Sequence, residues 1–194
     1  MWNPEEKFVF IHPQKCAGTS LRTILRDKYT NGKYKLKYEP RGSGHWRANQ
    51  WAEHIKNTTG EDISDYFVFG VVRNPWDRAV SYYHHLQRHK NYNKPFWRFI
   101  HKDSYITSHT YNIYNKFNIN NNYVMDFVVK QENFERDISE LMKKLGIGDY
   151  DIEHHTHDTK REGKAYHDFF DSDDLIDQVA ALSQFEINKF GYKF

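Results

Sequence analysis

Short apolar runs alternate along the chain with segments whose apolar residues recur every three or four positions. Residues 8–11 and 66–72 are apolar runs of strand length, which is typical of strands covered on both faces. Residues 125–129 (Met-Asp-Phe-Val-Val) also predict a strand. Strands that alternate with helical patterns predict a three-layer α/β fold, with a central parallel sheet flanked by helices. The predicted helices cover residues 21–28, 45–56, 76–90, 95–101, 133–145 and 171–190.

Two stretches show neither pattern. Residues 29–43 are polar, basic and dotted with glycine, which predicts a loop that can hold a short strand at 34–38. Residues 90–122 are rich in aromatic residues and asparagine, and we interpret them as an insertion or a substrate loop more than as core. Neither a linker nor an internal repeat divides the 194 residues, so we expect one domain over residues 1–194.

Composition and charge narrow the class of protein. The formal net charge is +2, so we expect no nucleic-acid partner, and any anion must be recognised locally. The single cysteine, Cys16, excludes an internal disulfide and any zinc site built on two thiolates. The N-terminus lacks the pattern of a signal peptide, and no apolar stretch approaches the roughly 20 residues of a membrane span. These features predict a cytoplasmic protein without a membrane span.

The first apolar run leads into the residues of a phosphate-binding loop. Lys15, Gly18, Thr19 and Ser20 follow residues 8–11 and come just before a helical pattern. Backbone N–H groups at a helix N-terminus favour anions, and a lysine adds a full positive charge. A nucleotide-triphosphate loop places its lysine directly after a glycine, whereas Lys15 precedes Gly18 here. The segment therefore predicts a phosphate loop that differs from that of an ATPase.

A second candidate anion-binding element follows the second apolar run. Residues 71–81 read Val-Val-Arg-Asn-Pro-Trp-Asp-Arg-Ala-Val-Ser, which puts Arg73 at the carboxyl end of a strand, where open α/β sheets bind ligands. Ser81 lies about two helical turns further along. Because the fork of arginine suits phosphate, Arg73 and Ser81 could bind one anion together. The alternative is that Arg73 pairs with Asp77 and that Ser81 faces solvent.

Together the two segments resemble the sulfotransferases that use 3′-phosphoadenosine 5′-phosphosulfate (PAPS), in particular the carbohydrate sulfotransferases and their small bacterial-type relatives. In that family a Lys-x-x-Gly-Thr-Ser-like loop binds the 5′-phosphosulfate, and residues 15–20 match it. An Arg-x-Pro-x-x-Arg-x-x-Ser-like element binds the 3′-phosphate, and residues 73–81 match its spacing. The resemblance also covers residues 126–134 and 190–194, and it is weakest across 29–60 and 90–122.

This resemblance implies a P-loop-like fold and an enzyme that moves a sulfonate group from PAPS to a hydroxyl acceptor by in-line transfer. It implies adenosine 3′,5′-bisphosphate (PAP) as the product, no required metal, and a carbohydrate as the favoured acceptor. Lys15 would stabilise the leaving phosphate, and the late basic residues 160–164 resemble a loop that covers the nucleotide. The residues expected to bind PAPS are Lys15, Cys16, Ala17, Gly18, Thr19, Ser20, Arg73, Ser81, Arg161 and Lys164.

The acceptor hydroxyl must lose a proton, and histidine is the natural base near neutral pH. His45 follows a glycine turn and, in our prediction, begins a helix. Similar carbohydrate sulfotransferases carry a Gly-His element in the same interval, with the histidine implicated as base. We therefore expect Lys15 and His45 to be the catalytic residues, with His12 and Glu53 as weaker rivals for the base. The alternative for His45 is a helix-capping surface residue.

Other interpretations remain at this point. His154, His155 and His157 near Asp158, or a pair formed by His85 and His89, could bind a metal, although the proposed transfer needs none. The chain could also be a divergent P-loop small-molecule kinase, or a nucleotide-binding module without catalysis. A kinase would need Mg²⁺-binding carboxylates near strand ends, where this sequence has Arg73.

Overall fold

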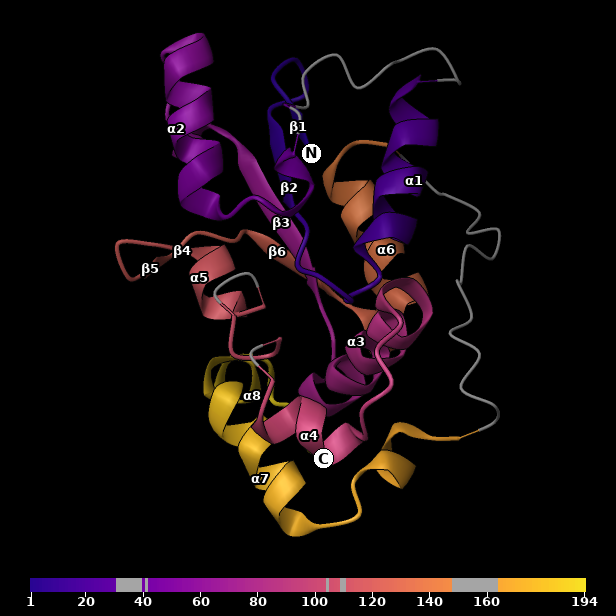
Figure 1. Ribbon diagram of the computed structural model, residues 1–194. Helices are drawn as coiled ribbons and strands as arrows, with labels where there is room; N and C mark the ends of the chain where they lie inside the picture. The colour runs from indigo at the N-terminus through magenta and orange to yellow at the C-terminus, as the bar shows by residue number, and fades with distance from the viewer. Residues whose placement is uncertain (31–39, 41, 104, 109–110, 148–163) are drawn as a thin grey trace. The chain divides into compact units, whose positions relative to one another are not determined.

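The structure, a computed structural model, describes residues 1–30, 40, 42–103, 105–108, 111–147 and 164–194 (Figure 1). The strand predicted at 34–38 and most of the basic segment 160–164 lie outside these residues. The chain divides into two units, each built from two segments. Unit 1 comprises Met1–Val72 with Asn115–Thr156, and unit 2 comprises Arg73–Tyr114 with His157–Phe194. Whether the chain is a single domain stays a prediction.

Unit 1 holds a four-stranded sheet in the order β1-β2-β3-β6. β2 (Phe8–Ile11), β3 (Phe67–Val72) and β6 (Phe127–Lys130) are parallel neighbours, and β1 (Trp2–Asn3) pairs with β2 in the antiparallel sense. Every residue of β2 is buried, as a strand covered on both faces requires. β6 begins later than the predicted 125–129, and the Asp126 carboxylate just before it accepts the Val68 N–H at 2.7 Å.

Helices flank this sheet within unit 1. Figure 1 shows α1 (Gly18–Thr30) and α6 (Phe134–Lys144) on one side of the strands and α2 (Ala48–Thr59) on the other. α1 extends beyond the predicted 21–28 at both ends, into the segment expected to be a loop. The prediction of an α/β fold with a central, mostly parallel sheet flanked by helices is confirmed. The remaining elements that belong wholly to this unit are short: η1 (Ser43–His45), η2 (Ile63–Asp65), β4 (Asn118–Ile119), β5 (Asn122–Tyr123) and η3 (Gln131–Asn133).

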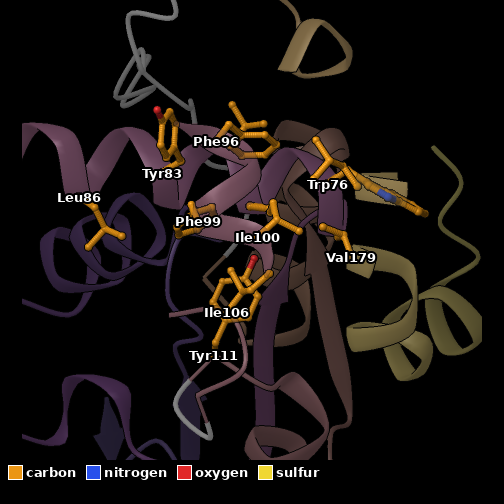
Figure 2. Close-up of a cluster of buried hydrophobic side chains, with 12 residues drawn as sticks. Trp76, Tyr83, Leu86, Phe96, Phe99, Ile100, Ile106, Tyr111 and Val179 are labelled. Carbon is orange, nitrogen blue, oxygen red and sulfur yellow. The ribbon is translucent and has the colours of Figure 1, made fainter. Parts of the chain in front are cut away.

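Unit 2 is built from helices around an aromatic cluster, shown in Figure 2. Phe96, Phe99, Ile106 and Tyr111 in this cluster come from the segment 90–122. That segment therefore contributes to a core. Its sequence did not predict this, because aromatic residues scattered among polar ones leave no periodic pattern. Its role beside an acceptor stays a prediction. The helices are α3 (Pro75–Lys90), α4 (Phe96–His101), η4 (Tyr166–Phe169), α7 (Asp173–Leu182) and α8 (Gln184–Phe190), and α5 (Ile113–Phe117) spans the division between the units.

Two other predicted helices were also wrong in their extent. The helix predicted over 45–56 begins at Ala48, because the 3-10 turn η1 (Ser43–His45) ends before it. His45 therefore belongs to that turn and caps no α-helix. The helix predicted over 171–190 is two helices, because the Ser183 backbone (φ −122°, ψ 25°) departs from helical values. Apolar spacing continues across such a break, so the pattern alone does not reveal it.

Candidate functional site

Two residues in the left-handed backbone region shape the loop between β2 and α1. Lys15 and Ala17 have φ angles of 64° and 61°. A side chain in this conformation costs about 1–2 kcal/mol per residue, and such strain tends to gather where a loop serves a ligand. Turns of this kind direct successive N–H groups into one anion-binding concavity. The loop therefore has the backbone that its sequence predicts for a phosphate site.

Gly18 lies where α1 begins, directly under the ring of His12. A Cβ atom at Gly18 would lie 1.9 Å from His12 Cδ2 and 2.3 Å from Nε2, so only glycine fits against this ring. The N–H groups of Ser20 and Leu21 donate to the Ala17 carbonyl at 3.1 and 3.3 Å. The earlier N–H groups of a helix have no acceptor within it and are the ones that an anion can use.

The predicted loop residues differ in exposure. Cys16 is fully buried, and its thiol lies 3.5 Å from the Gln14 carbonyl oxygen, which suits a small filler under the loop. Thr19 is exposed, whereas Ser20 is buried. Lys15 is half-buried.

His45 is held against the loop by its Nδ1 atom, which lies 3.0 Å from the His12 carbonyl oxygen. A carbonyl oxygen can only accept a hydrogen bond, so Nδ1 carries the proton and donates. In the neutral ring the lone pair is then on Nε2, the atom that could take a proton. The two histidine rings lie 4.8 Å apart between centroids.

The pKa of His45 is lowered from 6.5, mainly by partial burial of its ring. The hydrogen bond to the His12 backbone raises the pKa, while the positive charges of Lys116 and Arg22 lower it. His45 as a whole residue is exposed, but its ring packs against His12, and the ring is the part that titrates. The net shift keeps His45 neutral at neutral pH, which is the form that a base requires.

His12 is a poor alternative base. Burial, followed by electrostatic repulsion from His45 when it is protonated, from the N-terminus, Arg22 and Lys116, lowers its pKa to about 3. A group with such a pKa takes up a proton weakly near neutral pH. The structure instead gives His12 two contacts in the loop, its ring over Gly18 and its carbonyl oxygen on His45.

Lys116 is a residue of this region that sequence reasoning missed. It is 1% exposed, and its Nζ atom donates to the His45 carbonyl oxygen. The two residues are 71 positions apart, and Lys116 lies in the polar segment 90–122, so no local pattern connects them.

In unit 2, Arg73 and Ser81 are both buried, at 8% and 1% exposed. The Arg73 Nε atom donates to Asp77 Oδ2 at 2.6 Å, which is the ion pair that the alternative interpretation predicted. That interpretation also put Ser81 in solvent, and this part was wrong. Among the residues that the structure describes, the Ser81 hydroxyl has no hydrogen-bond partner. A buried polar group without a partner needs an explanation, and a bound ligand is one.

Asn74 and Arg78 organise the start of α3. The Asn74 side-chain oxygen accepts from the N–H groups of Trp76 and Asp77 at 3.0 and 3.3 Å, and its Nδ2 donates to the Lys193 carbonyl oxygen at 2.9 Å. The second arginine of the motif, Arg78, is fully buried. It donates to the Tyr111 carbonyl oxygen at 2.6 Å and lies 3.7 Å from the Glu186 carboxylate. Arg78 thus supports the core of unit 2.

The structure says little about the roles of the remaining predicted residues. Lys164 is exposed, and Arg161 lies outside the described residues, as do His154, His155, His157 and Asp158. The rings of His85 and His89 lie 4.6 Å apart on α3. Within the described ranges, no group of three or more His, Cys, Asp or Glu side chains could hold a metal ion. In the same ranges, no helix has the length and apolarity to span a membrane.

Comparisons with known proteins relate this chain to one family of enzymes. A family model described as the sulfotransferase family matches residues 1–193. An uncharacterized protein of Archaeoglobus fulgidus is 35% identical over 95 residues, which cover 48% of this chain and 79% of that protein. The crystal structure of a sulfotransferase from Alicyclobacillus acidocaldarius is similar with a TM-score of 0.46 and 14% identity, and the match covers 95% of this chain and 97% of that chain.

Proposed function

Because the chain belongs to the sulfotransferase family, we propose that it moves a sulfonate group from PAPS to the hydroxyl of an acceptor, with a carbohydrate as the favoured acceptor. One observation of the structure supports this proposal most directly. A neutral histidine, His45, is fixed through Nδ1 to a strained phosphate-type loop, which leaves its Nε2 as a base.

The residues present fit the donor. The loop residues Lys15 to Ser20 would bind the 5′-phosphosulfate through backbone N–H groups, and Lys15 would add its charge. Arg73 and Ser81 would bind the 3′-phosphate, and a phosphate oxygen would give the buried Ser81 hydroxyl the partner that the described residues do not provide. Family resemblance adds Arg161 and Lys164 as further contacts to the nucleotide.

The proposed transfer gives a residue a role at each reacting group. The acceptor oxygen forms a bond to sulfur while the bond from sulfur to the 5′-phosphate oxygen breaks, and PAP leaves. His45 Nε2 takes the proton of the acceptor hydroxyl, and the Lys15 ammonium stabilises the negative charge that develops on the leaving phosphate. Positioning and charge stabilisation of this kind dominate the catalysis of group transfers between oxygens.

Nucleotide selectivity tests the proposed function. We expect PAP to bind most tightly, because it supplies both phosphates that the two elements would bind, and at 100 times its Kd it would stabilise the folded protein by about 2.7 kcal/mol. 5′-AMP, which lacks the 3′-phosphate, should stabilise it less. Thermal unfolding with PAP, 5′-AMP and ATP–Mg²⁺ measures the difference. Equal or larger stabilisation by ATP–Mg²⁺ would contradict the proposal and favour a kinase, whereas selective PAP binding without transfer of label from PAPS to a panel of hydroxyl acceptors would favour a non-catalytic module.

The Ser81 hydroxyl gives a second test, which separates binding from folding. Ser81→Ala removes a buried hydroxyl that has no partner in the described residues, so the unfolding temperature without nucleotide should stay the same or rise. The loss of a hydrogen bond to a charged phosphate should weaken PAP binding by about 1.5 kcal/mol, or roughly tenfold. Calorimetric titration measures the affinity, and Ser183→Ala, at another buried serine of unit 2, is the control that should leave it unchanged. A lower unfolding temperature with unchanged affinity would make Ser81 a structural residue.

A further inference from the structure

We propose that Lys116 is a positioning residue for His45: its buried ammonium group holds the backbone of the turn that carries His45 and keeps a positive charge beside the imidazole. This inference rests on the proposed function, since it concerns the base of that reaction. It concerns contacts within unit 1 alone.

The turn that carries His45 is anchored at several points. The Ser43 N–H donates to the Pro40 carbonyl, and the Trp46 N–H donates to the Ser43 carbonyl, each at 3.0 Å. Lys116 Nζ then donates to the His45 carbonyl oxygen, and the His45 ring donates to the His12 carbonyl oxygen. The backbone and the side chain of His45 are therefore held from two elements far apart in the sequence, which fixes the direction of Nε2.

A lysine is an unusual residue for a purely structural anchor at this place. Lys116 is 1% exposed, and an ammonium group is among the most costly groups to remove from water. An apolar side chain of similar length would fill the same volume without that penalty. Its charge also acts on a neighbour, because His45 is a titratable group whose carbonyl oxygen this ammonium contacts.

The charged groups around His45 also support this role for Lys116. Among the described residues, the charged or titratable groups that act on it are Lys116 and Arg22, which lower its pKa, and His12, whose backbone oxygen raises it. Since His12 has a pKa of about 3, it is neutral near pH 7, and the two cations supply the charge. A positive charge disfavours the imidazolium form of His45. Lys116 thereby extends to lower pH the range in which His45 can accept a proton.

The test compares the titration of His45 in the wild type and in Lys116→Met, which removes the charge and the donor at similar length. Histidine NMR resonances of the full chain are followed against pH, and the His45 signals are identified by their loss in His45→Gln. We expect His45 to titrate at higher pH in Lys116→Met than in the wild type. The acid limb of kcat/KM for sulfonate transfer should move in the same direction, and kcat on the plateau should fall about tenfold, while the KM for PAPS changes little.

Lys56→Met is the matched control, because Lys56 is an exposed lysine of unit 1 paired with the exposed Asp62. It changes the net charge equally and should leave both the titration and the pH profile unchanged. If Lys116→Met does not fold, Lys116→Gln, which keeps a donor without the charge, is titrated in its place. An unchanged His45 titration in the folded variant overturns the role of Lys116. Absence of sulfonate transfer in the wild type overturns the proposed function instead, and the NMR comparison still decides the positioning.

Discussion

Replacing His45 with glutamine should lower kcat for sulfonate transfer by about 10²–10⁴-fold, the usual contribution of a general base, while binding of PAP is retained. The reason lies in the ring geometry. Nδ1 donates to the His12 carbonyl oxygen, so Nε2 holds the lone pair, and glutamine offers an amide in place of that base. The backbone carbonyl that Lys116 contacts is kept in the variant, so the turn and the loop should keep their structure.

The pH profile makes this test specific. A base must be neutral to act, so activity is lost as the pH falls through the pKa of His45. Because burial lowers that pKa from 6.5, the acid limb of kcat/KM should lie below pH 6.5 in the wild type. The limb should disappear in His45→Gln, where the residual rate no longer depends on this proton.

A matched variant is His89→Gln, at an exposed histidine of α3, which should keep the wild-type rate and the same acid limb. The measurements are transfer of label from PAPS and calorimetric titration with PAP. Full activity in His45→Gln would remove His45 as the base. Lost PAP affinity in that variant would show that His45 supports the loop and not the proton transfer.

The elements that the sequence predicted well are those with a strong local pattern. The apolar runs at 8–11 and 66–72 became β2 and β3, and the pattern at 76–90 became α3, with Asn74 and Pro75 at its start. The order of residues from Lys15 to Ser20 also indicated the turn into a helix, where the structure adds the two left-handed residues. Local sequence is sufficient in these cases because strand composition, helix caps and turn residues act within a few positions.

The features that the sequence did not reveal depend on contacts between distant residues. Nothing in the polar segment around Lys116 indicates that its ammonium lies buried on the His45 carbonyl. The pair of Arg78 and Glu186 likewise joins α3 to α8 across the second unit, so a motif arginine that resembles a phosphate ligand turns out to stabilise a core. The burial of Ser81 follows from the packing of α3, and a serine between apolar residues does not disclose which face it takes.

Replacing Lys15 with glycine should lower kcat by about 10²–10³-fold, the range observed when one group that stabilises developing negative charge is removed. Glycine is the informative substitution because Lys15 has a φ of 64°, a conformation that glycine adopts without strain. The loop backbone is therefore expected to persist, so the lost rate reports the ammonium group. Most of the loss should appear in kcat, with a smaller change in PAP affinity, if the charge acts mainly on the leaving phosphate in the transition state.

Lys7 provides the control for Lys15→Gly within the same unit. It also has a left-handed backbone, with a φ of 52°. Lys7 lies directly before β2, whereas Lys15 lies after β2. Its side chain pairs with Glu61 at the surface, so Lys7→Gly removes a lysine of the same backbone type without touching the loop. We expect Lys7→Gly to keep the wild-type kcat and Lys15→Gly to lose it, with both measured by transfer of label from PAPS. A similar rate in the two variants would contradict the role of Lys15, because it would show that the ammonium group at the loop does not stabilise the leaving phosphate.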